Sequence, residues 1–209
     1  MSKPPNFDEE NALQAQGYRF IAGVDEAGRG ALAGPVVAGA VILPYPAHLP
    51  WLSLVRDSKQ LSPRKREPLF DLIQRQAVAV GIGIVPSQII DSINILRATK
   101  LAMQQAIEQL SPLPQILLID RLTLPEISTL QKGITRGDEL CLSIACASII
   151  AKVTRDHIMM EFSKAYPDYG LAKHKGYGTA EHLACLRRLG PSPIHRLSFA
   201  PIKQTIEAK

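Results

Sequence analysis

Four acidic residues stand where the sequence pattern predicts the ends of buried elements. Asp25 and Glu26 end an apolar run that begins at Ile21, Asp120 ends another run, and Asp138 precedes a long apolar stretch. A buried carboxylate without a partner is strongly disfavoured, so acids in these places need a compensating cation. Hard divalent ions such as Mg²⁺ and Mn²⁺ prefer oxygen ligands. Two such ions held together can promote phosphodiester hydrolysis.

Each acid also has a simpler explanation. Asp138 could cap the helix that follows, and from local sequence alone we favour that interpretation. Asp120 could begin a turn and pair with Arg121. Asp25 and Glu26 are adjacent, and adjacent strand residues point to opposite faces, so they share a site only if the strand ends there or metals lie on both sides. For this pair we favour a functional role, because the apolar surroundings do not fit a surface position.

A glycine-rich loop follows the first acidic pair. In Gly28-Arg29-Gly30, backbone N–H groups and a guanidinium can approach an anion closely, although a tight turn is the commoner reason for such a pattern. The spacing matches neither the Walker loop nor the dinucleotide fingerprint. Tyr177 lies between two glycines and just after two basic residues. It can stack on a sugar or base beside cations that meet phosphate, or it is an ordinary loop tyrosine.

The elements that must position these residues alternate between strands and helices. Apolar runs bounded by Gly and Pro predict strands at 21–26, 36–43, 77–85 and 116–119. Apolar residues at helical spacing predict helices at 63–76, 87–92, 94–110, 141–165 and 179–188. We expect loops at 44–51 and 122–133, and an irregular tail from 192 with a helix at its end. Residues 1–17 are predicted to be a loose lead-in, with a short helix from Phe7, before one domain at 18–209.

Composition narrows the class of protein without fixing its function. The chain has 209 residues, 46% of them hydrophobic, which is enough for a sizeable core. A net charge of +5 and a pI of about 9.2 fit a polyanionic partner, but this signal is weak alone. Arg56, Lys59, His195 and Arg196 are by default solvated charges.

Cysteine usage and the N-terminus indicate a cytoplasmic protein. The three cysteines include no CxxC pair, so neither a disulfide framework nor a zinc site is predicted. The N-terminus is polar and acidic, unlike a signal peptide, and no apolar stretch is long enough to span a bilayer. We therefore expect no membrane association.

Six stretches of the chain carry a family resemblance. They are GVDEAGRGALAGPVVAGAVIL (23–43), DSKQLS (57–62), INILRATKLAM (93–103), GDELCLSIACASIIAKVTRD (137–156), YPDYGLAKHKGYGT (166–179) and HRLSFAP (195–201). Together they closely resemble bacterial ribonuclease HII, the type 2 RNase H, from about residue 18 to 201. The first motif is highly specific. One departure is visible, because the family usually has Asp-Gly at the third acid and this chain has Asp120-Arg121.

The resemblance implies a fold and an activity. The implied fold is α/β and RNase H-like, with a mixed five-stranded sheet flanked by helices and a helical C-terminal part. The implied activity is hydrolysis of RNA in RNA–DNA hybrids and incision 5′ of ribonucleotides embedded in duplex DNA, leaving 3′-OH and 5′-phosphate ends. Removal of misincorporated ribonucleotides and RNA primers would be its role. We expect a monomer, although no residue pattern fixes the oligomeric state.

The resemblance also implies roles for individual residues. By motif position, the family's catalytic and metal-binding carboxylates correspond to Asp25, Glu26, Asp120 and Asp138, with Mn²⁺ or Mg²⁺ as the cofactor. Gly28, Arg29 and Gly30 correspond to the motif that recognises the ribose 2′-OH, the one group that separates RNA from DNA at a given site. Tyr177 falls where the family's tyrosine stacks on the next deoxyribose.

Three other functions compete with this interpretation. Another RNase H-like nuclease, such as a junction resolvase or an integrase-type enzyme, would also need an acid cluster. A hybrid-binding module without catalysis would bind regardless of metal and give no product. A nucleotide-binding protein could use the glycine loop for phosphate, but the chain lacks the Walker lysine and serine pair.

Overall fold

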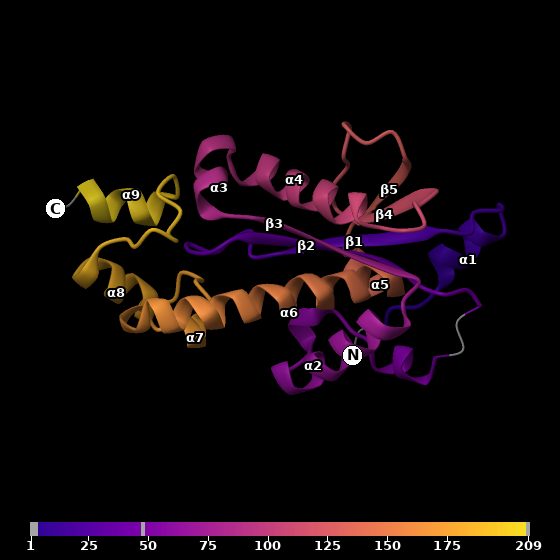
Figure 1. Ribbon diagram of the computed structural model, residues 1–209, viewed down its shortest axis with the longest axis horizontal. Helices are drawn as coiled ribbons and strands as arrows, with labels where there is room; N and C mark the ends of the chain where they lie inside the picture. The colour runs from indigo at the N-terminus through magenta and orange to yellow at the C-terminus, as the bar shows by residue number, and fades with distance from the viewer. Residues whose placement is uncertain (1–3, 47–48, 208–209) are drawn as a thin grey trace.

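Five strands form one sheet that lies between two helical layers (Figure 1). The computed structural model describes residues 4–46 and 49–207, so residues 1–3 of the predicted lead-in, 47–48 of the predicted loop and 208–209 lie outside the described residues. The strands are β1 (Ile21–Ala27), β2 (Val36–Ile42), β3 (Ala79–Val85), β4 (Ile116–Asp120) and β5 (Leu130–Ile134).

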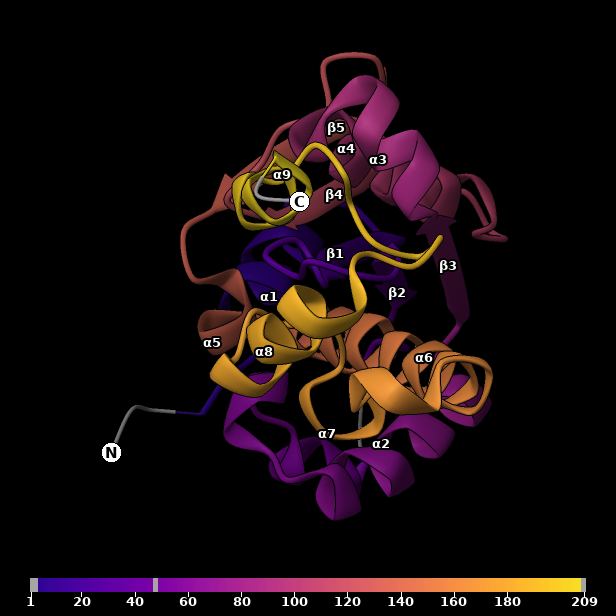
Figure 2. The same ribbon diagram turned by 90° about the vertical axis from the view of Figure 1, so that its left-hand side faces the viewer.

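The α-helices are α1 (Asp8–Gln14), α2 (Pro63–Gln76), α3 (Ser87–Ile93), α4 (Ile95–Glu108), α5 (Gly137–Leu140), α6 (Leu142–Ala165), α7 (Leu171–His174), α8 (Ala180–Leu189) and α9 (Ala200–Glu207). Short 3₁₀ turns cover Pro50–Leu54, Ser58–Gln60 and Pro167–Tyr169. Figure 2 shows α7, α8 and α9 gathered at one end of the molecule. The prediction of a helical C-terminal part is therefore confirmed.

The sheet is mixed, as predicted. Its strand order is β3-β2-β1-β4-β5, in which the pairs β3–β2 and β2–β1 are antiparallel and the pairs β1–β4 and β4–β5 are parallel. Strand β1 is therefore central and carries the first acidic pair near its carboxyl end. Strand β2 is buried at every position, which explains its uninterrupted run of apolar and small residues.

Each face of the sheet is covered by one long helix. Helix α4 packs on the face that presents Ala22 and Val24, while α6 packs on the face that presents Gly23. A Cβ atom at Gly23 would lie 2.1 Å from the Ser143 carbonyl carbon, so only glycine permits this approach of α6 to β1. The long helix is thereby held against the strand that ends in the acids.

Asn94 caps the start of helix α4 with its own side chain. Asn94 has φ 67 and accepts hydrogen bonds from Leu96 N and Arg97 N through its Oδ1 atom. This satisfies two of the backbone donors that a helix start leaves free. Thr179 caps α8 in the same way through His182 N.

Two local predictions are wrong. Residues 122–133 include part of strand β5, which the sequence pattern hid because only Ile134 of its five residues is buried. The lead-in is not loose, since Asn6 N donates to Leu140 O at 3.0 Å and Leu13 is buried with residues of β1, β4 and α6. The predicted division into 1–17 and 18–209 stays a prediction.

His195 and Arg196 are also corrected. Only 2% of His195 and 0% of Arg196 is exposed, so neither is a solvated charge. Both make hydrogen bonds beside a cluster of buried apolar residues, which forms where α6, α8 and α9 meet the loop after β1. Lys59 is exposed as expected, but it forms an ion pair described below.

Candidate active site

Two neighbouring strands bring Asp25 and Asp120 to one edge. Val24 of β1 pairs with Ile119 of β4 in the parallel register, so the two aspartates are the next residues on their strands. Val24 and Ile119 both belong to the core on the α4 side. Because side chains alternate along a strand, both aspartates project toward the α6 face.

Glu26 would point to the opposite face in a continuing strand. However, β1 ends one residue later at Ala27, and Glu26 lines the same cleft as Asp25. Glu26 N donates to Asp25 Oδ1 at 2.7 Å, and Arg29 Nη1 lies 3.6 Å from Glu26 Oε1. The pairing of β1 with β4 stops at Val24, so β1 runs past the end of β4, and both adjacent acids line one cleft although Glu26 still pairs with Ala38 of β2.

Asp138 joins the group through the short helix α5. Gly137 N donates to Asp120 Oδ1 at 2.8 Å, which fixes the start of α5 beside the end of β4. The interpretation of Asp138 as a helix cap is wrong. The residue before α5 is Arg136, the residue before α6 is Cys141, and Asp138 caps neither helix.

All eight residues predicted to act in the site line one cleft of about 860 Å³. They are Asp25, Glu26, Gly28, Arg29, Gly30, Asp120, Asp138 and Tyr177. The remaining lining includes the basic residues Lys59, Arg66, Arg121, Arg136 and Lys152. The cleft therefore combines a group of carboxylates with these five basic side chains. This is the charge pattern expected for a site that binds metal ions and a phosphate backbone.

The carboxylates repel one another. Burial raises the pKa of Asp25 well above its usual range, and the negative charges of Glu26, Asp120 and Asp138 raise it further. Burial likewise raises the pKa of Glu26 and of Asp120. A bound cation would relieve this repulsion, because it favours the charged form of each acid.

One oxygen in the group has no partner. Glu26 Oε2 is buried and accepts no hydrogen bond from any residue that the structure describes. Buried polar atoms are almost always satisfied by a donor, water or an ion. The orphan oxygen and the mutual repulsion of the acids both fit a divalent cation in the cleft.

The acids do not form a closed cage. Among residues 4–46 and 49–207, no three acidic, histidine or cysteine side chains are grouped tightly enough to surround one ion. Mg²⁺ commonly binds through one or two carboxylates, with water and substrate phosphates as its other ligands. An open arrangement is therefore compatible with ions that bind together with a phosphodiester.

Lys59 lines the cleft and Asp57 lies beside it, although the sequence analysis assigned neither residue a role. Lys59 Nζ lies 3.2 Å from Asp138 Oδ2 and 4.0 Å from Asp57 Oδ1. Burial lowers the pKa of Lys59, but Asp138 and Asp57 outweigh it, so the net pKa is raised and the ammonium stays charged. The signal that could have found them was the polar DSKQLS motif, whose charges follow a predicted loop.

Arg121 occupies an unusual backbone conformation. Its φ is 58, in the left-handed region that favours glycine. A glycine at this position, as the resembled family usually has, would adopt the same turn without strain. The turn after Asp120 is therefore preserved despite the larger residue.

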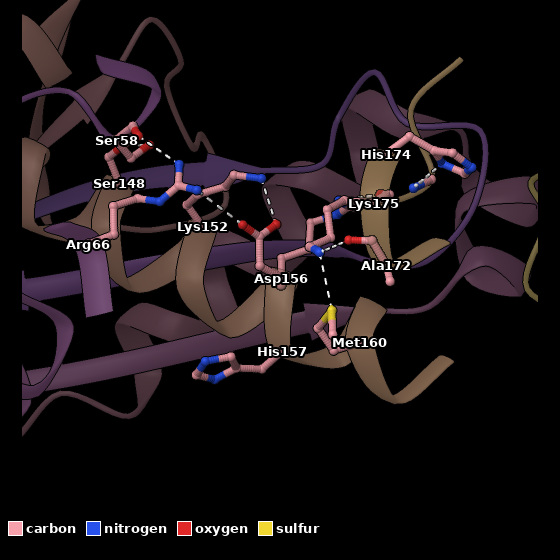
Figure 3. Close-up of polar contacts among 12 residues, drawn as sticks. Ser58, Arg66, Ser148, Lys152, Asp156, His157, Met160, Ala172, His174 and Lys175 are labelled. Atoms are coloured by element: carbon pink, nitrogen blue, oxygen red, sulfur yellow. Dashed lines mark hydrogen bonds and ion pairs between the residues drawn. The ribbon is translucent and has the colours of Figure 1, made fainter. Parts of the chain in front are cut away.

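A network of polar contacts holds the basic residues Arg66 and Lys152 of the cleft in place (Figure 3). Asp156 Oδ1 accepts from Lys152 Nζ at 2.6 Å, and its Oδ2 lies 3.4 Å from Arg66 Nη2. Arg66 Nη1 donates to Ser58 O at 2.8 Å, and Ser148 Oγ donates to Ser58 Oγ at 2.7 Å. The segment that carries Lys59 is thus tied to α2 and α6.

Tyr177 faces cations at the rim of the cleft. Lys152 Nζ lies 5.7 Å and Arg155 Cζ 5.3 Å from the centre of its ring. Arg155 is itself buried and donates to Pro35 O, Ala33 O and Lys175 O at 2.9–3.0 Å. One guanidinium therefore joins the segment before Tyr177 to the loop after β1.

Comparison with known proteins identifies the family. A family model for ribonuclease HII matches residues 22–202. The chain belongs to the ribonuclease HII family. A ribonuclease HII from Dehalococcoides mccartyi strain 195 is 55% identical over 203 residues, which cover 97% of this chain and 96% of the relative.

Solved structures agree with the fold. The ribonuclease H2 of Pyrococcus horikoshii OT3 is similar with a TM-score of 0.72 and 27% identity, covering 90% of this chain and 97% of that one. The RNase HII of Archaeoglobus fulgidus, solved in complex with PCNA, has a TM-score of 0.73 and 25% identity, covering 86% and 95%. The predicted RNase H-like fold is confirmed.

Family membership gives the general activity. The protein is an endoribonuclease that hydrolyses RNA in RNA–DNA hybrids, and the family depends on divalent metal ions. In the described part of the chain, no helix is long and apolar enough to cross a membrane.

Proposed function

We propose that Asp25, Glu26, Asp120 and Asp138 hold Mn²⁺ or Mg²⁺ and that the enzyme incises 5′ of ribonucleotides embedded in duplex DNA. The observation that carries this proposal is the convergence of the four acids, from β1, β4 and α5, on one cleft with the glycine-rich loop. When bound, a pair of such ions activates the attacking water and stabilises the departing 3′ oxygen. The products carry 3′-OH and 5′-phosphate ends.

Residues of the chain fix the positions of the carboxylates and supply positive charge for the phosphate backbone. Asp25 and Asp120 hold their carboxylates side by side at the strand ends, so the charge that attracts cations is fixed by the sheet. Lys59 pairs with Asp138 and supplies positive charge where a phosphate would enter. Arg66 and Lys152 extend that charge along the cleft and can meet neighbouring phosphates.

The glycine-rich loop and Tyr177 supply recognition. Gly28 has φ 90 and Gly30 has open space around it, so the backbone can approach a sugar without a side chain in the way. We assign Gly28, Arg29 and Gly30 to the ribose 2′-OH and Tyr177 to the following deoxyribose. Both assignments rest on their place in the cleft and on motif position.

We further infer that the enzyme acts as a cytoplasmic monomer that removes misincorporated ribonucleotides and RNA primers. All eight site residues come from one chain, so a second copy is not needed to complete the cleft. The three cysteines are free, which fits a reducing compartment.

The experiment that tests this function is cleavage of a DNA duplex with one embedded ribonucleotide, in Mn²⁺, in Mg²⁺ and in a chelator. We expect a single metal-dependent cut on the 5′ side of the ribonucleotide, and no cut in an all-DNA four-way junction. Junction cleavage would support a resolvase instead. Binding of the duplex without product would support a non-catalytic module.

A further inference from the structure

Three segments of the chain are joined by hydrogen bonds close to Tyr177. They are the loop 28–34 after β1, the segment 174–178 that contains Tyr177, and the segment 192–196 before α9. Leu32 N donates to Gly176 O at 2.8 Å, and Gly34 N donates to Ile194 O at 2.8 Å. The other two segments are thus each joined to the loop 28–34 by a backbone hydrogen bond.

Arg196 reaches the glycine-rich loop. Its Nη1 donates to Arg29 O at 3.0 Å, and its Nε and Nη2 donate to Gly34 O at 3.1 and 2.9 Å. The guanidinium is fully buried, and it makes no ion pair with an acid among the described residues. Burying a charge in this way is costly, so its contacts with the loop carbonyls are the compensation.

His195, which precedes Arg196, is linked to Tyr177 through His182. His195 Nε2 lies 3.0 Å from His182 Nε2, and His182 Nδ1 lies 3.0 Å from Tyr177 O. Both histidine rings are buried, and His174 stacks on His182 with ring centres 4.3 Å apart. A continuous path therefore runs from Arg29 O through Arg196, His195 and His182 to Tyr177 O.

The hydrogen-bond partners of His182 and His195 determine which ring nitrogen of each histidine carries the proton. Tyr177 O only accepts, so His182 Nδ1 must be the donor, and its Nε2 is then the acceptor in the neutral ring. His195 Nε2 must donate to it. The other nitrogen of His195, Nδ1, accepts from Ser192 N at 2.9 Å. One arrangement of neutral rings satisfies the bonds from His195 to His182, from His182 to Tyr177 O and from Ser192 N to His195, and in it the 3.3 Å contact of His195 Nδ1 with Ser192 O is not a hydrogen bond.

We propose that His182 and His195 are positioning residues that hold Tyr177 at a fixed distance from the Gly28–Gly30 loop. The two groups that read the ribonucleotide and the next deoxyribose would then be spaced by the protein interior before the substrate arrives. The inference rests on the proposed recognition roles of Tyr177 and the loop. It extends them to residues that do not face the cleft.

Two substitutions of one residue separate positioning from general packing. Asn at position 182 can place its amide nitrogen near Nδ1 and keep the donor to Tyr177 O, whereas Gln places it near Nε2 and loses that donor. Both variants lose the stacked ring equally. The measurement is KM and kcat on a duplex with one embedded ribonucleotide, with the melting temperature as the control for folding.

We expect His182→Gln to raise KM roughly five- to tenfold, as loss of one hydrogen bond would, with little change in kcat. His182→Asn keeps the bond to Tyr177 O and loses only the bond to His195, so its KM should rise clearly less than that of His182→Gln. Equal KM values for the two variants would overturn the inference, because a packing role does not distinguish the two donors.

Tyr177→Ala distinguishes this inference from the proposed function. If Tyr177→Ala leaves KM unchanged, Tyr177 does not contact the substrate, and both the assignment and the positioning role fail. If Tyr177→Ala raises KM while His182→Gln does not, the assignment of Tyr177 stands and only the positioning role fails.

A measurement on the unaltered protein covers the case in which His182→Gln does not fold. Nitrogen-15 NMR of histidine-labelled full-length protein at neutral pH reports the tautomer of each ring. We expect His182 to carry its proton on Nδ1 and His195 on Nε2. A proton on His182 Nε2, or on both of its nitrogens, would contradict the path to Tyr177.

Discussion

Asp25 is a buried acid whose nearest charged neighbours are also acids. Its pKa is raised first by burial and then by Glu26, Asp120 and Asp138, and no cation of the chain pairs with it among the described residues. Packing alone would be better served by an apolar side chain at this position. The arrangement is understandable if the acids hold metal ions during catalysis.

His195 gives a pH dependence that can be measured. Burial, followed by the proximity of His182, lowers the pKa of His195 to about 4. In the unfolded chain its pKa returns to about 6.5, so the unfolded state takes up the proton first. The stability that neutral His195 contributes is therefore complete above about pH 6.5 and is lost as the pH falls toward 4.

We predict that His195→Gln is less stable than the wild type at pH 7.5 and that the gap narrows by on the order of 2 kcal/mol at pH 4.5. Urea unfolding at both pH values measures it. His157→Gln compared in a Glu67→Gln background is the control, because His157 is exposed on α6 and its only charged partner among the described residues is Glu67, 3.1 Å away. A gap that does not change with pH would contradict the buried neutral ring.

At the residue scale, the acids could be predicted and the buried basic residues could not. Asp25 and Asp120 follow apolar runs, which is a local signal. Arg196 and His195 lie in a short polar segment without periodicity. Their burial arises from contacts such as that of Arg196 with Gly34, which is 162 positions away. The sequence alone contains no sign of that pairing.

At the scale of elements, apolar periodicity predicted most helices and strands but missed polar or interrupted ones. Strand β5 is largely exposed, so its residues show no apolar alternation. Helix α5 is separated from α6 by Cys141, which has an extended backbone with φ −108 and ψ 129. This break gives Asp138 its own short helix beside β4 instead of a place in α6.

Helix α1 supports the start of α6 through one side chain. Glu10 is buried, and its Oε1 accepts from Ser143 N at 2.9 Å and from Ser143 Oγ at 2.6 Å. Ser143 N is one of the backbone donors that a helix start leaves free, and an acid is favourable near that end of the helix.

We predict that Glu10→Ala lowers the free energy of unfolding by about 1–3 kcal/mol, because a buried N–H and hydroxyl lose their acceptor. Asn11→Ala, an exposed change on the same helix, should cost less than about 0.5 kcal/mol. Urea unfolding of the two variants decides the matter. Equal midpoints for them would show that α1 does not stabilise α6.

At the scale of the whole molecule, the sheet and the C-terminal helices supply different residues of the cleft. The sheet and α5 supply the four carboxylates, while the segments around α7 and α8 supply Tyr177 and its support. The family resemblance predicted a mixed five-stranded sheet with a helical C-terminal part, whereas residue patterns alone did not specify the strand order or the docking of that part. The loop after β1 joins the two regions.

Divalent ions should stabilise the folded protein without substrate. We predict that millimolar Mg²⁺ or Mn²⁺ raises the melting temperature by about 2–4 °C, as a gain of about 1 kcal/mol would for a chain of this size. The physical reason is that the ions cancel repulsion among the buried acids. Thermal unfolding with and without a chelator measures it, and Asp25→Asn should show a smaller rise. An equal rise in both proteins would place the ions elsewhere.

The most direct test of the account is single-turnover cleavage of a duplex with one embedded ribonucleotide by Asp25→Asn and by the wild type. Asn preserves the shape of the side chain and removes its charge. We predict that the rate falls by roughly three orders of magnitude or more, while the melting temperature without metal stays equal or rises. A folded Asp25→Asn protein that cuts at the wild-type rate would contradict the assignment of the carboxylate cleft as the active site.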